Sequence, residues 1–313
     1  MHPAQVYIIH ENDEWTQNVT QCLDKKKTPY QLWNLSEGIL DLTQSPPQGV
    51  FYNRMSASSH TRGHRYSPEF TQQLIQWLEF HKRKVINGSG AIDLEISKIK
   101  QYLQLERSGI KTPKTIAVLG KHRIIEAARQ LNIYPLISKH NRAGKGLGVH
   151  LFRSETELAA YVNSEEFEPS VDGITLLQQY IKPHDGRIRR SEFIGGDFFY
   201  TVAVDSSDGF ELCPADACNI DFNQSAPCSI DGKFKIIDPL PADRQAAYAS
   251  FLKTAGIDVA AIEWVQDADG QIYVYDVNTN TNYNSEAEAR ANLFANERLA
   301  DYLHMALEEL PQA

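Results

Sequence analysis

The alternation of short apolar runs with amphipathic segments constrains the fold of this chain more than any other sequence feature. Within residues 1–90 the apolar runs lie at 6–10, 30–35, 49–54 and 84–86. Segments of helical period separate them, and one of these begins at Pro68. Such alternation is typical of a parallel sheet whose strands are joined by crossover helices. We therefore expect an N-terminal α/β domain over residues 1–90.

After residue 90 the pattern changes to a small α+β unit and then to a strand-rich segment. Helical periods are found at 96–108, 123–130, 155–163 and, at the end of the chain, 285–310. Strands are expected at 115–118, 134–139, 149–152, 174–181, 188–193, 198–205, 260–265 and 271–278. From the helical and strand periods we place a second subdomain at 91–170 and a third at 171–313.

Charge, hydropathy and cysteine usage exclude several classes of protein. The net charge of −9 argues against a nucleic-acid partner, because such affinity comes from basic surfaces that replace counterions. No apolar stretch is long enough to span a bilayer, so we expect no membrane partner. Four cysteines without a CxxC pair, and no export signal in residues 1–14, predict a cytoplasmic protein with reduced thiols. Cys213, Cys218 and Cys228 fit no zinc spacing and are expected to be buried or to line a substrate site.

A glycine-rich stretch lies between two of the expected strands. Residues 142–148 read RAGKGLG, which places glycine at 144, 146 and 148. Without Cβ atoms, the backbone amides there can approach an anion closely. The stretch has neither the GxxxxGK[ST] of a P-loop nor the GxGxxG of a dinucleotide site. A flexible hairpin tip and a phosphate-binding flap both fit, and the cations of Lys139 and Lys145 favour the flap.

Two carboxylates and an amide near the end of the chain predict a metal site. Asp276 and Asn278 are two residues apart on an expected strand, so their side chains share a face. Asp269-Gly270 predicts a hairpin turn that places Glu263 directly opposite Asp276. Opposed carboxylates destabilise a sheet, and Mg²⁺ prefers such hard oxygen ligands. The alternative is a pair of acids at an exposed sheet end, but the apolar residues around them favour the metal.

Two further segments carry weaker signals. The strand at 174–181 reaches a turn at Pro183 and could present backbone groups to an adenine edge, although an ordinary core strand explains it better. Arg54 and Arg62 follow the third expected strand of the first domain, where open α/β sheets bind ligands. Their loop could receive a carboxylate substrate, and a solvated loop fits equally well.

Taken in order, these pieces resemble the ATP-grasp superfamily, nearest to RimK-type α-L-glutamate ligases and glutathione-synthetase-like enzymes, over about residues 87–306. The resemblance implies an ATP-grasp fold preceded by an N-terminal parallel-sheet domain. The residues that it assigns to the nucleotide are Lys98, Lys139, Gly144, Gly146, Gln179, Tyr180 and Ile181. The residues that it assigns to Mg²⁺, or alternatively Mn²⁺, are Glu263, Asp276 and Asn278.

The sequence departs from the family pattern at several of these positions. Gln179 stands where the family usually has an acid, and Asp276 stands where it usually has Glu. No arginine lies between Arg190 and Arg244, so Arg189, with Lys145, is expected to steady the transferred phosphoryl group, ahead of Lys233 or Lys235. The loop at 279–284, with Asn280 as a candidate substrate contact, replaces the family's Pro-Gly loop and implies a substrate other than a glutamyl protein.

The resemblance implies an ADP-forming carboxylate–amine ligase that acts through an acyl phosphate. The expected partners are ATP and small-molecule or peptide carboxylate and amine substrates, and the oligomeric state is left open, a homo-oligomer included. The alternatives are an ATP-grasp small-molecule kinase and an ATP-binding regulatory protein without turnover.

Overall fold

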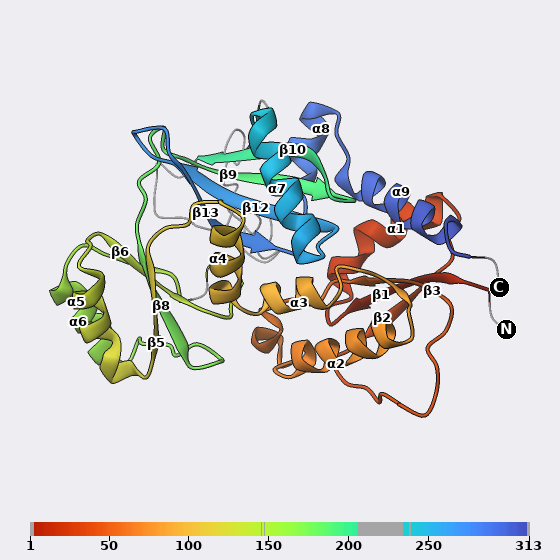
Figure 1. Ribbon diagram of the computed structural model, residues 1–313, viewed down its shortest axis with the longest axis horizontal. Helices are drawn as coiled ribbons and strands as arrows, with labels where there is room; N and C mark the ends of the chain where they lie inside the picture. Colours follow the sequence, from red (N-terminus) through yellow and green to blue (C-terminus); the bar gives the residue numbers. More distant parts are fainter. Residues whose placement is uncertain (1–2, 145, 147, 206–233, 238, 312–313) are drawn as a thin grey trace, which may run out of the picture.

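The computed structural model describes residues 3–144, 146, 148–205, 234–237 and 239–311. Within these residues the strands form a parallel sheet of order β2-β1-β3-β4 and two antiparallel sheets, of order β5-β8-β6-β7 and β11-β10-β9-β12-β13. The parallel sheet and the sheet of β5 to β8 lie at opposite ends of the molecule in Figure 1, with the third sheet between and above them.

The first domain is the parallel α/β unit that the sequence predicts. Its strands are β1 (Gln5–His10), β2 (Tyr30–Asn34), β3 (Gly49–Asn53) and β4 (Lys84–Ile86), and its helices include α1 (Gln17–Lys25) and α2 (Ser67–Phe80). Val6 and Ile8 of β1 pack in one core with α1 and the C-terminal helix, whereas Tyr7 and Ile9 pack in another with α2. The central strand is buried on both faces, which explains its continuous apolar run.

The second sheet forms a separate lobe. It contains β5 (Thr115–Leu119), β6 (Leu136–His140), β7 (His150–Phe152) and β8 (Ile174–Gln179), and it carries α5 (Ile124–Leu131) and α6 (Glu155–Asn163). Ile124 and Leu158 of these helices share a core with Leu136 and Leu177 of the sheet. This lobe presents the turn between β6 and β7, which contains the glycine-rich stretch.

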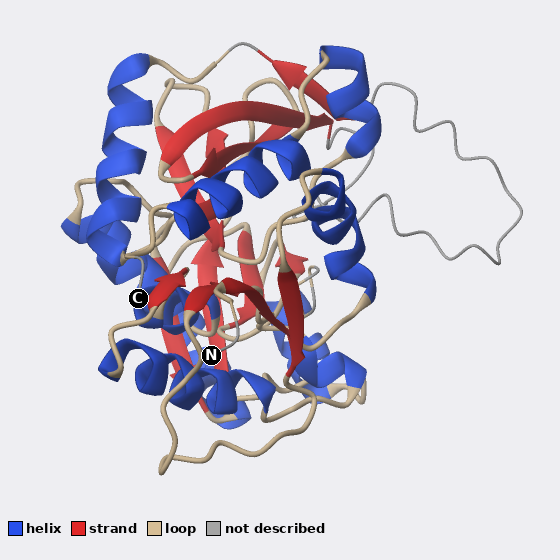
Figure 2. Ribbon diagram, turned by 90° about the vertical axis from the view of Figure 1, so that its right-hand side faces the viewer, coloured by secondary structure: helices blue, strands red, loops and turns tan. Residues whose placement is uncertain are grey.

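The third sheet carries the predicted metal hairpin. Its strands are β9 (Arg187–Ile194), β10 (Asp197–Asp205), β11 (Phe234–Ile237), β12 (Val259–Gln266) and β13 (Ile272–Asn278). Helices α4 (Lys98–Arg107) and α7 (Ala242–Ala255) share a core with β12 and β13. Helices α8 (Ser285–Ala291) and α9 (Ala295–Glu308) share a core with β9, β10 and the parallel sheet. In Figure 2 the helices accordingly flank the strands on both sides.

The helices depart from the sequence expectations in three places. The single closing helix expected over 285–310 is two helices, because Asn292 adopts a left-handed conformation (φ 53°) that ends α8. Helix α7 was missed, although its buried residues Tyr248, Phe251, Leu252 and Ala255 have the spacing of one helix face. Helix α4 falls within the second subdomain proposed from sequence and α3 (Ser89–Glu95) crosses its first boundary, but both pack with the third sheet. The domain boundaries stay a proposal.

Candidate active site

The predicted metal ligands lie together on the hairpin of β12 and β13. Glu263 is opposite Asp276, and the Asn278 side-chain amide donates to Glu263 Oε1 at 2.9 Å. The turn is longer than expected, because Gln266 pairs with Ile272 and residues 267–271 form the connection. A register shift after Glu263 pairs Trp264 with Val274 instead of Tyr275, and this bulge restores the predicted Glu263–Asp276 pairing.

Helix α4 brings Lys98 to this hairpin. The Gln101 side chain of α4 accepts from the Val277 N–H at 3.0 Å and donates to the Val277 carbonyl at 2.8 Å. The Tyr102 hydroxyl of the same helix donates to the Tyr275 carbonyl at 2.9 Å. One turn earlier on the helix, Lys98 Nζ lies 2.6 Å from Asp276 Oδ1. The helix therefore covers the hydrogen-bonding edge of β13 and places a cation at a candidate metal ligand.

Strand β6 brings Lys139 to the same place from the other lobe. Its Nζ donates to the Tyr275 carbonyl at 3.2 Å and lies 5.1 Å from the centroid of the Tyr102 ring. Asn141, just after this strand, accepts two of the free N–H groups at the start of α4. The N–H of Lys98 donates to the Asn141 backbone carbonyl at 3.1 Å, and the N–H of Ile99 donates to the Asn141 side-chain oxygen at 3.0 Å. The two lysines predicted for the nucleotide thus converge on one hairpin.

Burial perturbs the ionisation of this cluster. Burial, reinforced by the positive charge of Lys98, lowers the pKa of Lys139 to about 7. Burial, reinforced by the charge of Asp276, raises the pKa of Glu263 to about 8. An anion beside Lys139 would favour its charged form, and a cation at Glu263 would do the same for the carboxylate. Strongly perturbed groups of opposite type at one place are typical of a functional site.

The donor set of the hairpin suits a hard divalent cation. Glu263 and Asp276 supply carboxylate oxygens, and Asn278 can supply an amide oxygen if its side chain turns. Mg²⁺ is usually bound by one or two carboxylates together with substrate phosphates, so an incomplete protein cage is expected. The described residues contain no cluster of three His, Cys, Asp or Glu side chains suited to a metal, so at the hairpin the third protein ligand would be the amide of Asn278. Cys213, Cys218 and Cys228 lie outside the described residues.

The glycine-rich turn has the conformations that require glycine. Gly146 and Gly148 have φ of 69° and 66°, and a Cβ on Gly148 would lie 2.3 Å from His140 Nε2. A Cβ on Gly146 would meet no atom within 4 Å. Gly148 is thus required by packing within the lobe, whereas Gly146 faces open space. Lys145 lies outside the described residues.

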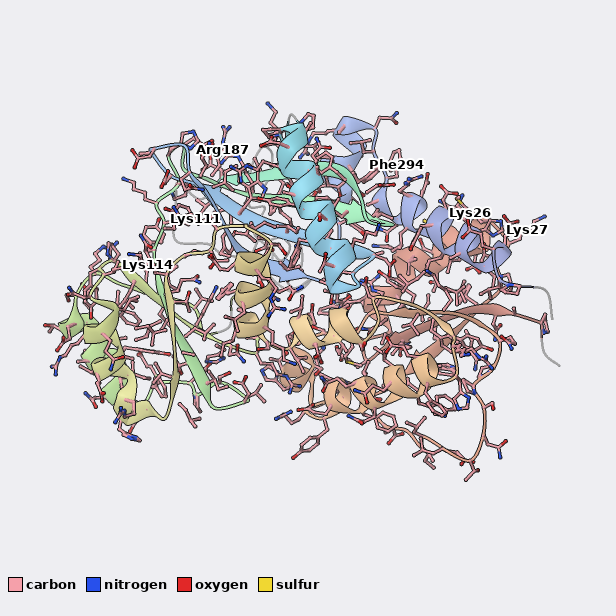
Figure 3. The ribbon with its side chains drawn as sticks, viewed as in Figure 1. Lys26, Lys27, Lys111, Lys114, Arg187 and Phe294 are labelled. Carbon is pink, nitrogen blue, oxygen red and sulfur yellow. The ribbon has the colours of Figure 1, made fainter. Side chains whose placement is uncertain are left out.

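The predicted hinge connects the two antiparallel sheets. The Gln179 N–H donates to the Lys114 carbonyl at 2.8 Å and that of Tyr180 to the Pro135 carbonyl at 3.2 Å. Ile181 packs in a small cluster with Val265 and Tyr275 of the metal hairpin. Lys114, whose carbonyl accepts this bond, lies between the two sheets in Figure 3. The hinge residues therefore adjoin the lysine and metal cluster.

Arg190, and not Arg189, lies at the metal hairpin. Strand β9 pairs with β12 so that Arg190 is opposite Glu263 and Arg189 opposite Trp264. Arg190 Nη1 lies 3.5 Å from Glu263 Oε1. Arg189 instead stacks over the Trp264 ring and bonds to Asp185 on the other face. Arg189 thus lies on the opposite face of β9 from Arg190, because neighbouring residues of a strand point to opposite faces, and its expected role at the phosphoryl group stays a prediction. Of the alternatives, Lys235 lies on β11, at the far edge of the sheet from β13, and Lys233 lies outside the described residues.

Of the predicted substrate residues, Arg54 and Asn280 are joined by a hydrogen bond, whereas Arg62 pairs with an acid of the first domain. Arg54 Nε donates to Asn280 Oδ1 at 3.1 Å. Arg62 instead binds both carboxylate oxygens of Glu11, at 2.5 and 3.1 Å, and lies over the Trp15 ring. Arg62 is thus engaged within the first domain.

The loop after Asn278 is held by side chains that the sequence analysis did not single out. The fully buried Asn87 donates to the carbonyls of Thr279, at 2.9 Å, and Val259, at 2.7 Å. Glu95 accepts from the N–H and hydroxyl of Thr279, both at 2.9 Å. Asn87 has a positive φ of 57°, a conformation that asparagine adopts more readily than most residues. These contacts join the end of the metal hairpin to the first domain.

No family model matches the chain, and no curated protein matches it significantly. Solved structures do. A RimK-domain ATP-grasp protein from Sphaerobacter thermophilus has a TM-score of 0.66 at 15% identity, over 96% of this chain and 99% of that one. The ATP-grasp ligase PsnB, complexed with a minimal precursor, has a TM-score of 0.67 at 14% identity, over 98% and 100%. An ATP-grasp ligase associated with RiPPs, from Chryseobacterium gregarium and in complex with ADP and a leader and core peptide, has a TM-score of 0.60 at 16% identity, over 99% and 98%.

The chain therefore has the ATP-grasp fold, as the resemblance implies. These structures match nearly all of it, so the N-terminal parallel-sheet domain belongs to the shared architecture. PsnB has also been crystallised with Mg and ADP. None of the described helices has the length and apolar character that a bilayer crossing requires.

Proposed function

We propose that this chain is an ADP-forming carboxylate–amine ligase that uses ATP and Mg²⁺, with Mn²⁺ as an alternative ion. One observation carries the proposal: Glu263, Asp276, Lys98 and Lys139 converge on one hairpin, although they come from three separate parts of the chain. Two buried cations beside a buried and a partly buried acid are costly to assemble unless a ligand uses them. A nucleotide with a divalent cation has the complementary charges.

The nucleotide is placed by the surrounding elements. Lys98 and Lys139 neutralise phosphate charge, and the turn with Gly144, Gly146 and Lys145 closes over the phosphates. The adenine lies at the hinge of Gln179, Tyr180 and Ile181. In support, the Ile181 N–H has no backbone hydrogen-bond partner among the described residues, which leaves it for a ring nitrogen. Val265 and Tyr275 supply apolar surface beside it.

The proposed reaction uses the residues that would surround the γ-phosphate of ATP. A substrate carboxylate oxygen attacks the γ-phosphorus, the bond to the β-phosphate oxygen breaks, and an acyl phosphate and ADP form. The amine then attacks the acyl carbon, inorganic phosphate leaves with the carbon–oxygen bond pair, and the amine nitrogen loses a proton. Mg²⁺ on Glu263, Asp276 and Asn278 would supply charge neutralisation for the transferred phosphoryl group. Arg190, in place of Arg189, stabilises the same charge, and the protein contributes mainly positioning and electrostatics.

The substrates are proposed only as a class. PsnB is complexed with precursor peptides, and D-cycloserine synthetase DcsG also has this fold at 13% identity. Both a peptide and a small molecule are therefore compatible with the fold. Asn280 stays a candidate substrate contact, because its loop adjoins the metal hairpin.

A hydroxylamine trap tests the proposal. Enzyme with Mg-ATP is incubated with a broad acid panel and hydroxylamine, and ADP and hydroxamate are measured together. A ligase forms both in equal amounts, because hydroxylamine replaces the amine at the activated carbonyl. ADP without hydroxamate indicates a kinase. Stabilisation by Mg-ATP, of about 2.7 kcal/mol at a hundredfold excess over Kd, without turnover on any acid that binds, indicates a regulatory protein.

A further inference from the structure

Arg54 is a buried cation at the junction of the first domain and the loop after the metal hairpin. It follows β3 and is 4% exposed. Its guanidinium donates to Asn280 Oδ1 at 3.1 Å, to the Thr281 carbonyl at 3.1 Å and to Asn282 Oδ1 at 2.9 Å. All three acceptors are neutral oxygens.

The charge of Arg54 therefore lacks a carboxylate. Three other arginines in this part of the molecule, Arg62, Arg142 and Arg190, each contact an acid, at distances of 2.5 to 2.6 Å. Arg54 has no such ion pair in the part of the chain that the structure describes, and none of its recorded hydrogen bonds uses Nη1. Since an uncompensated buried charge is strongly unfavourable, the site is complete only with an anion.

A second buried group lies beside Arg54. The Arg54 N–H donates to the Ile9 carbonyl at 2.7 Å, which places Arg54 next to His10 at the end of β1. His10 is 2% exposed, and neither of its ring nitrogens has a hydrogen-bond partner among the residues that the structure describes. Its Nδ1 lies 3.7 Å from Asp13, beyond hydrogen-bonding distance. His10 is the last residue of β1 and Arg54 follows β3, so both lie at the carboxyl ends of parallel strands, where open α/β sheets bind ligands.

The position of Arg54 separates it from the reacting group. Arg190 lies at Glu263 and donates to Thr281 Oγ1 and the Asn282 carbonyl. Arg54 contacts the same two loop residues at different atoms, the Thr281 carbonyl and Asn282 Oδ1. Arg54 makes no hydrogen bond to a candidate metal ligand. An anion on Arg54 is therefore a different group from the one at the γ-phosphate.

We propose that Arg54 binds a second, non-reacting carboxylate of the substrate, with His10 beside it. The identification of the anion as a substrate carboxylate rests on the proposed ligase function. Binding of an anion to Arg54 can be measured without turnover. This identification assigns the substrate to acids or amines that carry a carboxylate besides the reacting group: dicarboxylic acids, amino acids and peptides with a free carboxyl group. Arg54 is then a specificity-determining residue.

The anion site can be measured by NMR with sodium acetate as the probe. The arginine Nε–Hε resonance of Arg54 is assigned by its loss in Arg54→Lys and followed during titration at constant ionic strength. We expect a saturable shift with acetate and none with acetamide, which has the same shape without the charge. An Arg54 signal that does not respond, or that drifts without saturation as the signals of exposed arginines do, overturns the proposal.

Kinetics then separate anchoring from support of the loop. For a substrate with a second carboxylate, Arg54→Gln should raise KM by about 10- to 100-fold, as expected for a lost hydrogen bond to a charged group. The same variant should leave KM unchanged for the analogue amidated at that carboxylate. Asn282→Ala, which removes a loop contact but keeps the guanidinium, should affect both substrates alike. Equal effects of Arg54→Gln on both substrates would show a purely structural role.

Mg-AMPPNP binding, read by thermal shift, keeps the two proposals apart. Wild type and Arg54→Gln should be stabilised equally, because Arg54 does not contact the nucleotide site. If wild type is not stabilised at all, the ligase proposal fails, while the acetate titration still decides the anion site.

Discussion

Lys98 Nζ lies 2.6 Å from Asp276 Oδ1, so a cation predicted for the nucleotide and a carboxylate predicted for the metal form one ion pair. Burial opposes the charge of Lys98, but the charge and hydrogen bond of Asp276, together with the charges of Glu263 and Glu95, outweigh it and raise the pKa of the lysine. In this arrangement Lys98 compensates the acidic hairpin. Binding of Mg-ATP would give each group a new partner, phosphate for the lysine and metal for the carboxylate, without leaving either charge unpaired.

Asp276→Asn tests the metal assignment. The substitution keeps the shape of the side chain and removes its charge, so we expect Mg²⁺-dependent ADP release to fall at least about 100-fold. The protein should still fold, although the loss of the ion pair with buried Lys98 lowers its thermal unfolding midpoint. Asp269→Asn, in the exposed turn of the same hairpin, is the matched control and should keep full activity. Wild-type turnover in Asp276→Asn would remove this residue from the metal site.

Gly146→Val tests the flap, with Gly256→Val as control. Both glycines have positive φ, 69° and 67°, and a Cβ on either meets no atom within 4 Å. Each substitution should therefore cost a similar conformational energy, about 1–2 kcal/mol. Gly256 ends α7, away from the glycine-rich turn, so Gly256→Val should lose stability alone. Gly146→Val should also lose most of its steady-state activity, and equal kcat/KM in the two variants would argue against a phosphate flap.

Local sequence patterns predicted the secondary structure better than the residues of the candidate site. Alternation and helical period identified the parallel sheet and most strands, because burial on defined faces imposes those periods. The pairing of Glu263 with Asp276 was predicted from a two-residue turn, but a longer turn and a bulge produce it. The extra residue of the bulge breaks the two-residue alternation, since Val274 and Val277 pack in one core although they are three residues apart. The prediction did not use this spacing.

The missed site residues depend on contacts between distant segments. Choosing Arg190 over Arg189 requires the register of β9 on β12, and these strands are not joined by a hairpin. The roles of Asn87 and Glu95 require the loop at 279–284 to meet the first domain. Such registers follow from the packing of the whole molecule, and one sequence holds no local signal for them.

Arg190→Met and Arg189→Met form a pair that tests the proposed assignment. Arg190 lies at Glu263, so we expect its loss to lower kcat by roughly 100- to 1,000-fold, as for other groups that stabilise transition-state charge. Arg189 is buried and pairs with Asp185 on the opposite face, so its loss should lower the free energy of unfolding while changing kcat little. A larger kcat defect in Arg189→Met than in Arg190→Met would restore the original assignment.

Glu11→Gln tests how the ionisation of Glu11 makes the stability of the protein depend on pH. Glu11 is 3% exposed and bonds to Arg62 at 2.5 Å and to His64 at 3.0 Å. Burial favours the neutral form, but the hydrogen bonds from Arg62 and His64 outweigh it and lower the pKa of the carboxyl. A lowered pKa means that ionised Glu11 stabilises the fold above its unfolded pKa of about 4.3. This stability is lost as the pH falls through the lower, folded pKa.

The free energy of unfolding of wild type should therefore exceed that of Glu11→Gln by about 2–3 kcal/mol at pH 7. This difference is smaller than for a fully buried ion pair, because Arg62 and His64 are partly exposed. Urea unfolding at a series of pH values measures this difference. It should stay level down to about pH 5 and then shrink towards lower pH, since both proteins become neutral at this position. Glu155→Gln, which breaks the exposed pair with Arg129, should change stability little at any pH. A Glu11 difference that stays constant from pH 7 to about pH 3 would mean that packing, and not the charge, makes Glu11 stabilising.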